Sequence, residues 1–111
     1  MDDTVRYRIN VVGVDGEPQA PVDVARKFVK QCGFLVRDYI PITVQEWNRP
    51  SGGGVPYVSD TAKDKLFAKL MINFLLSRPD VNPYEEERAK KELVQRVKKF
   101  ALSKMADAFK N

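Results

Sequence analysis

The sequence predicts an α+β fold that is mainly α-helical, with three to four helices, a short N-terminal strand and a candidate edge strand. Two patterns carry this prediction. Apolar and polar residues alternate near the N-terminus, whereas farther along the chain apolar residues recur every three or four positions. The length of 111 residues corresponds to one domain, residues 1–111, which is large enough to bury a core.

The alternating segment covers residues 4–14 and predicts a half-buried strand. One side of it carries Val5, Tyr7, Ile9 and Val11. Prolines at positions 18 and 21 follow closely, so we expect no tight hairpin directly after the strand. The expected partner is the run at residues 55–58, which Pro56 restricts to a sheet edge because it lacks an N–H donor. A second copy of the chain is the other candidate partner.

A first helix is predicted over residues 21–32, and a further helical turn over residues 34–39. The first helix has an apolar stripe made of Val24, Phe28, Val29 and Cys32. Gly33 suits the end of this helix. Because Pro41 has no N–H and disfavours helix at the preceding residue, helical structure should stop at Ile40.

A short helix is expected over residues 43–49. Thr43 and Glu46 have the spacing of a capping box, in which each side chain accepts a hydrogen bond from the other residue's backbone N–H. This helix would orient Trp47, the only tryptophan, which we expect to fill the core. The alternative is that Trp47 anchors a partner protein.

Residues 49–56 are predicted to form a flexible loop, because they include three successive glycines. The next helix should begin with a cap at residues 59–61 and run to about Leu76. Its apolar residues recur at three- and four-residue steps: Ala62, Leu66, Phe67, Leu70, Met71, Phe74 and Leu75.

The last predicted helix is basic and covers about residues 83–110. Asn82 suits its N-cap, Pro83 its first position and Glu85 its third. At roughly 1.5 Å per residue the helix would be about 40 Å long, which exceeds what a domain of this size needs. It should therefore either kink or project one end toward a partner.

The residue types argue against catalysis. Histidine, the commonest general base and metal ligand, is absent, and Cys32 is the only cysteine, whereas a structural zinc site takes four Cys or His ligands. Asp60 and Asp64 lie one turn apart, but we interpret them as residues of a helix start. We expect no enzyme activity, no cofactor, no metal and no small-molecule substrate, and we expect Cys32 to be a buried structural thiol.

The net charge of +4 is unevenly distributed. Residues 88–111 carry eight basic and two acidic residues, a net charge of +6, which leaves −2 for the rest of the chain. A basic terminal segment can bind nucleic acid, a membrane surface or an acidic partner. The candidate DNA-contacting residues are Arg88, Lys91, Arg96, Lys98 and Lys99. The alternative is a solvated helix face supported by Glu–Lys pairs at four-residue spacing.

Three blocks of the chain resemble a known family. The first contains Gly16-Glu17-Pro18, Gln31-Cys32-Gly33, Leu35-Val36-Arg37-Asp38, Ile40-Pro41-Ile42-Thr43 and Glu46-Trp47. The second contains Tyr57-Val58-Ser59-Asp60, Lys63, Leu66 and Phe67, and the third runs from Ala89-Lys90-Lys91 to Phe109. In this order, over about residues 16–110, they resemble the plant transposase family of the Ptta/En/Spm (CACTA-like) type. The loose Gly52-Gly53-Gly54 insert departs from that family. The resemblance implies a transposon-derived nuclear protein whose catalytic residues lie elsewhere.

Our leading hypothesis is a non-catalytic DNA-binding or DNA-associated module of a plant transposon-derived protein. The basic C-terminal helix would contact the phosphate backbone, since no helix-turn-helix with a recognition helix is evident. The alternative is a protein–protein interaction or homodimerisation module without DNA affinity. No stretch of 18 apolar residues exists, so we expect an intracellular protein with no membrane association.

Overall fold

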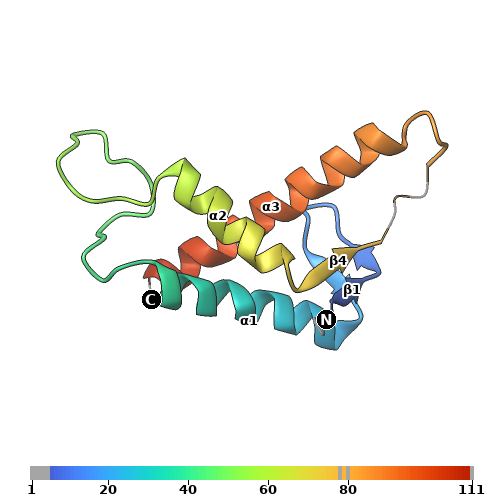
Figure 1. Ribbon diagram of the computed structural model, residues 1–111, viewed down its shortest axis with the longest axis horizontal. Helices are drawn as coiled ribbons and strands as arrows, with labels where there is room; N and C mark the ends of the chain where they lie inside the picture. Colours follow the sequence, from blue (N-terminus) through green and yellow to red (C-terminus); the bar gives the residue numbers. More distant parts are fainter. Residues whose placement is uncertain (1–5, 78, 80, 111) are drawn as a thin grey trace, which may run out of the picture.

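The computed structural model describes residues 6–77, 79 and 81–110. Helices dominate this part of the chain and short strands gather beside the N-terminal end of the first helix (Figure 1). In chain order the elements are β1 (Tyr7–Ile9), β2 (Val11–Val12), β3 (Pro18–Ala20), α1 (Val22–Tyr39), α2 (Asp60–Met71), β4 (Phe74–Leu76) and α3 (Glu86–Lys110). The predicted mainly helical α+β fold is confirmed.

The N-terminal strand segment pairs with two different partners. β1 pairs in parallel with β4, and β2 pairs antiparallel with β3. The predicted pairing with residues 55–58 is wrong, because Val58 donates its backbone N–H to Glu46 at 3.0 Å. The first residues of the predicted strand, 4 and 5, lie outside the described residues. Since β1 and β2 both have partners within the chain, an unpaired strand no longer argues for self-association.

A tight turn joins β2 to β3, contrary to the expectation from the two prolines. Gly13 donates its N–H to the Glu17 carbonyl at 2.8 Å, and Pro18 starts β3, where it lies opposite Val12. Gly16 has a φ of +87°, and a Cβ at this position would lie 2.0 Å from the Arg96 carbonyl oxygen. Only glycine therefore allows this turn to lie against α3.

Helix α1 is one continuous helix, so the predicted end at Gly33 is wrong. Its buried side chains include Val24, Phe28 and Cys32, as the apolar stripe predicts, whereas Val29, the fourth residue of that stripe, is 41% exposed. The helix ends at Tyr39, with Ile40 in an extended conformation as its C-cap. Pro41 therefore ends the helix as expected, whereas Gly33 is accommodated inside it because α1 buries one side along its whole length.

The short helix expected over residues 43–49 is absent, and the predicted capping box does not form. Glu46 instead pairs with Tyr57 across an isolated β-bridge, and the backbone N–H groups of Gln45 and Glu46 both donate to the Pro56 carbonyl. The Glu46 N–H, one of the two backbone donors that a capping box would use, is thus bonded to Pro56 instead. Trp47 is only 7% exposed and its ring lies 5.9 Å from that of Phe109, so its predicted place in the core is confirmed.

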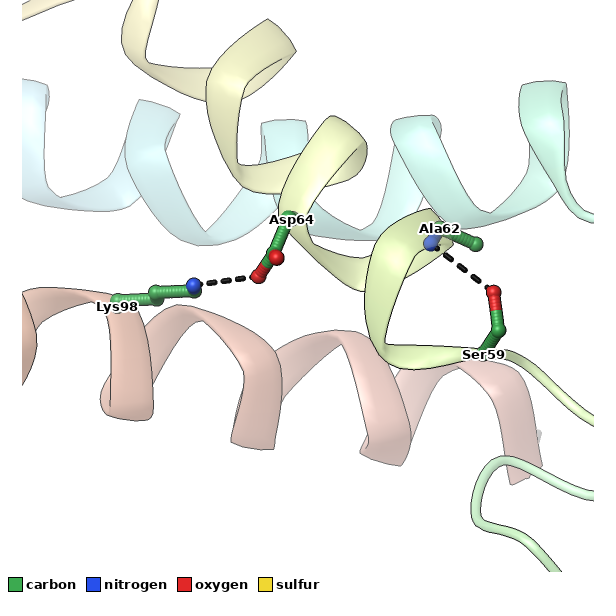
Figure 2. A network of polar contacts seen from close by, with 4 residues as sticks. All are labelled: Ser59, Ala62, Asp64 and Lys98. Atoms are coloured by element: carbon green, nitrogen blue, oxygen red, sulfur yellow. Dashed lines mark hydrogen bonds and ion pairs between the residues drawn. The ribbon is translucent and has the colours of Figure 1, made fainter.

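Helix α2 begins as predicted but ends early. The Ser59 hydroxyl accepts a hydrogen bond from the Ala62 N–H at 3.1 Å, which confirms the N-cap (Figure 2). The helix ends at Met71, because the next apolar residues form β4 instead of a further turn. The Arg6 guanidinium donates to the carbonyls of Met71 and Phe74, so β1 and its flanking arginine bind the segment that the helix would otherwise include.

Helix α3 begins at Glu86, after a turn over residues 83–85. The predicted N-terminal signal is confirmed in part, since the Asn82 side chain accepts from the Glu85 N–H at 3.1 Å. The 25-residue helix runs to Lys110 and is about 37 Å long. Its amino-terminal part extends beyond the sheet and away from α1 (Figure 1).

The core lies where α1, β4 and α3 meet. Phe28 is fully buried, and its ring lies 5.1 Å from that of Phe74 in an edge-on arrangement and 6.3 Å from that of Phe100. Cys32 is fully buried one turn farther along α1, as expected for a structural thiol. Burial raises the pKa of this thiol to about 12, because the thiolate would lose its hydration.

Replacing Gly16 by alanine should lower the free energy of unfolding by at least about 2 kcal/mol. The new methyl group would meet the Arg96 backbone, and the positive φ would be strained. Gly52→Ala is the matched control, because a Cβ there meets nothing within 4 Å and the expected change is within about 0.5 kcal/mol. Urea unfolding followed by circular dichroism measures both, and equal stabilities would contradict the contact.

Truncating Trp47 to alanine should cost about 3–5 kcal/mol of unfolding free energy, since it leaves a large cavity beside Phe109. Ile42 provides the control, because its side chain is fully exposed and Ile42→Ala should change stability by less than about 0.5 kcal/mol. A Trp47→Ala variant with the same melting temperature as the wild type would show that the ring does not stabilise the core.

The raised pKa of Cys32 predicts a loss of stability at high pH. Above about pH 9 the thiol of the unfolded chain ionises while the folded chain keeps its proton to about pH 12, so rising pH favours unfolding. The stability difference between wild type and Cys32→Ala should be about 1.4 kcal/mol smaller at pH 10 than at pH 8. A difference that stays constant over this range would mean that the buried thiol titrates normally.

Candidate nucleic-acid interface

The outward face of α3 carries most of the predicted DNA-contacting residues. Arg88, Lys91 and Lys99 are exposed, and their spacings of three, eight and eleven residues place them on one side of the helix. The opposite side buries Val97 and Ala101 in the core. The three cations therefore face solvent, while the opposite side of the helix packs against the core.

Arg96 borders this face on the side of the β2–β3 turn. The backbone of Arg96 touches Gly16, and its side chain lines a shallow depression of about 320 Å³ together with Lys99 and Asp15. Asp15 places one carboxylate beside two cations, which lowers the local positive charge. Within the described part of the chain, Arg88, Lys91, Arg96 and Lys99 form no side-chain hydrogen bond or ion pair.

Lys98 is placed differently from the other four. Its ammonium donates to the Asp64 carboxylate on α2, so that it joins α3 to α2 (Figure 2). Its side chain is 28% exposed, against 62% for that of Asp64. An exposed pair of this kind contributes little stability, about 0–1 kcal/mol, but it directs the lysine toward α2 and away from the outward face of α3.

The described residues hold no group of three or more His, Cys, Asp or Glu side chains that could bind a metal ion. Asp60 lies in the first turn of α2, as a residue of a helix start should, and Asp64 bonds Lys98. Cys32 is buried and its high pKa keeps it protonated, so it is not an available nucleophile. No helix in the described residues has the length and hydropathy to cross a membrane.

A second grouping, in which lysines lie over aromatic rings, was not predicted from the sequence. Lys27 on α1 lies over the Tyr7 ring of β1, with its Nζ 5.1 Å from the ring centre. Lys69 on α2 lies 4.5 Å from the centre of the Tyr39 ring on α1. Each pair joins two elements that are far apart in the chain, so no local spacing could have predicted it.

A wide groove of about 940 Å³ lies between the C-terminal ends of α1 and α3 and the loop that follows α1. Trp47 and Phe109 form part of its wall, and Ile42 projects fully exposed from the loop. The groove therefore offers apolar surface next to the aromatic pair that closes this end of the core.

Comparison with known proteins leaves the chain without an assigned relative. No family model, no curated protein and no solved structure matches it. The resemblance to plant transposases therefore stays a prediction, and the functional argument rests on the exposed residues and their charges.

Proposed function

We propose that the chain is a non-catalytic DNA-associated module whose helix α3 contacts the phosphate backbone. The observation that carries this proposal is that Arg88, Lys91, Arg96 and Lys99 are exposed on α3 and have no side-chain partner in the described residues. Arginine and lysine on a helix face suit phosphates, because each contact neutralises a charge and releases a counterion.

The charge distribution along α3 supports contact by its middle part. The helix carries eight basic and four acidic residues, and two of the acids, Glu86 and Glu87, lie in its first turn. Glu86 and Glu87 thus lie where the helix dipole is positive, while the cations continue from Arg88 onward with the exposed Glu92 among them. A phosphate backbone lying across the helix would meet mainly positive charge.

Contacts of this kind position a protein on DNA without reading its sequence. The outward residues of α3 belong to a helix whose other side is buried. We therefore expect weak, non-specific affinity of roughly 10⁻⁴ to 10⁻⁶ M at physiological salt. A nuclear location and a transposon origin accord with this role and are proposed on the family resemblance.

A protein-interaction or homodimerisation module is the second candidate. The observation in its favour is the groove beside Trp47, at which Ile42 exposes its whole side chain. Exposed apolar surface next to a concave wall is typical of interaction sites. Under this hypothesis the cations of α3 would only keep the helix solvated.

The charge-reversal variant Arg88→Glu/Lys99→Glu should abolish binding to a short DNA duplex without unfolding the protein, because both side chains are exposed. If Arg88, Lys91, Arg96 and Lys99 all meet phosphates, the wild-type slope of log affinity against log salt should be about −3.6, and the neutral variant Arg88→Gln/Lys99→Gln should bind with about half that slope. Fluorescence anisotropy of a labelled duplex at several salt concentrations measures both quantities.

Arg26→Glu/Arg49→Glu is the control, since it lowers the net charge by the same amount at exposed positions outside α3. It should retain most of the duplex affinity. Equal losses in the two variants would show that only overall charge matters. Duplex binding that survives the α3 exchange would remove α3 from the mechanism and leave the interaction-module hypothesis in front.

A further inference from the structure

A second cationic surface lies over β1, α1 and α2, separate from the outward face of α3. We name it the aromatic–lysine band, and it consists of Tyr7, Lys27, Lys30, Phe34, Tyr39 and Lys69. We propose that this band binds single-stranded DNA, with the rings stacking on unpaired bases and the lysines contacting phosphates. The proposal shares with the proposed function only the choice of DNA as the nucleic acid.

The three rings of the band are open to solvent. Tyr7 is 38% exposed, Phe34 45% and Tyr39 54%, whereas Phe28 and Phe74 in the core are fully buried. Aromatic side chains normally bury most of their surface, so three exposed rings on neighbouring elements call for an occupant. A nucleic-acid base is a flat ring system that stacks on such a surface whatever its identity.

The lysines place positive charge directly beside these rings. Lys27 and Lys69 lie over Tyr7 and Tyr39 in cation–π contacts at 5.1 Å and 4.5 Å, and Lys30 lines the same pocket as Phe34. Such contacts at exposed sites contribute only about 0.5–1 kcal/mol, so a lysine can move from the ring to a phosphate at small cost. The phosphate of a stacked nucleotide would lie within reach of the same side chain.

A pocket of about 390 Å³ lies between Tyr7 and Phe34 at the centre of the band. Its lining contains two lysines, the amide side chains of Gln31 and Asn73, and no carboxylate. Amides offer both donors and acceptors to a base edge, so the pocket accepts different bases. This lining favours an anionic, aromatic ligand over an apolar peptide or a cationic one.

The band follows the direction of α1. Lys27, Lys30 and Phe34 are spaced by three and four residues and share one side of the helix, and Tyr39 lies at its end, about 18 Å from Lys27. Asp23 and Asp38 also lie on α1 near the two ends of the band, which confines the strongest anion attraction to its middle. A strand running along α1 would meet Lys27, Lys30 and Phe34 first, and the Lys69–Tyr39 pair at the C-terminal end of the helix.

This chemistry suits a single strand and not a duplex. The bases of a duplex are stacked on one another and cannot reach a protein ring unless they are extruded, which costs a few kcal/mol for each base. Rings interleaved with cations are instead typical of surfaces that bind single strands without sequence preference. On α3 the ring beside Arg96 and Lys99, that of Phe100, is partly buried against the core, so this face is suited to the duplex backbone.

The test uses the whole chain and a labelled oligodeoxythymidylate of about 16 nucleotides, the upper end of known site sizes. Phe34→Ala and Tyr39→Ala should each weaken binding about 5- to 140-fold, and Phe34→Trp should restore it because it returns a ring. Tyr84→Ala is the matched control, since this ring is 99% exposed and outside the band, and it should bind as the wild type does. Thermal melts establish that each variant is folded.

The contribution of the lysines is measured by the salt dependence of the affinity. Lys30→Gln should reduce the slope of log affinity against log salt by about 0.7, the value for one phosphate contact in a single strand. The α3 variant Arg88→Glu/Lys99→Glu should keep its oligothymidylate affinity even where duplex binding is lost. Wild-type protein that binds the oligonucleotide but no duplex would overturn the role of α3 and leave the band in place.

Four results would overturn the proposal. They are the absence of oligothymidylate binding, equal losses in Phe34→Ala and Tyr84→Ala, wild-type affinity in folded Phe34→Ala and Tyr39→Ala, and tighter binding of the matching oligouridylate, which would assign the band to RNA.

Discussion

The ring contacts of the buried Phe28 determine how the helices and the β1–β4 sheet are arranged. Its ring meets Phe74 from β4 and Phe100 from α3, so that one α1 side chain joins three elements. Because interiors are close-packed, this contact determines which sides of α1 and α3 remain outside. The outward cations of α3 and the exposed rings beside α1 are both consequences of the sides that the core uses.

Apolar spacing predicted the existence of the three helices but not all of their ends. Each helix buries one stripe against the same core, and a stripe is visible in a single sequence. Phe74 and Leu75 fit the stripe of α2 equally well, yet they form β4 because the backbone of β1 needs hydrogen-bond partners. Gly33 remains helical because α1 continues to pack against α3 beyond this residue. A Cβ at this position would make only an ordinary contact with Ala108, at 3.9 Å, so no close approach requires glycine here.

The helix expected over residues 43–49 was wrong for a related reason. A capping box contributes about 1 kcal/mol, whereas burying a tryptophan contributes several times as much. The extended backbone around Glu46 pairs with Tyr57 and brings Trp47 against Phe109. A local signal of this size decides the structure only where no larger long-range contact competes with it.

The two candidate surfaces differ in the same way. One follows from spacing within a single helix, and the other depends on contacts between distant parts of the chain. Arg88, Lys91 and Lys99 belong to one helix, so its period was enough to place them together. The aromatic–lysine band joins β1, α1 and α2, and it lies in the part of the chain whose net charge is −2. A phosphate responds to charges within about a Debye length, 8–10 Å, and not to the sum over a segment. An acidic segment can therefore fold into a local cationic surface, because folding brings Lys27 and Lys69 to exposed rings.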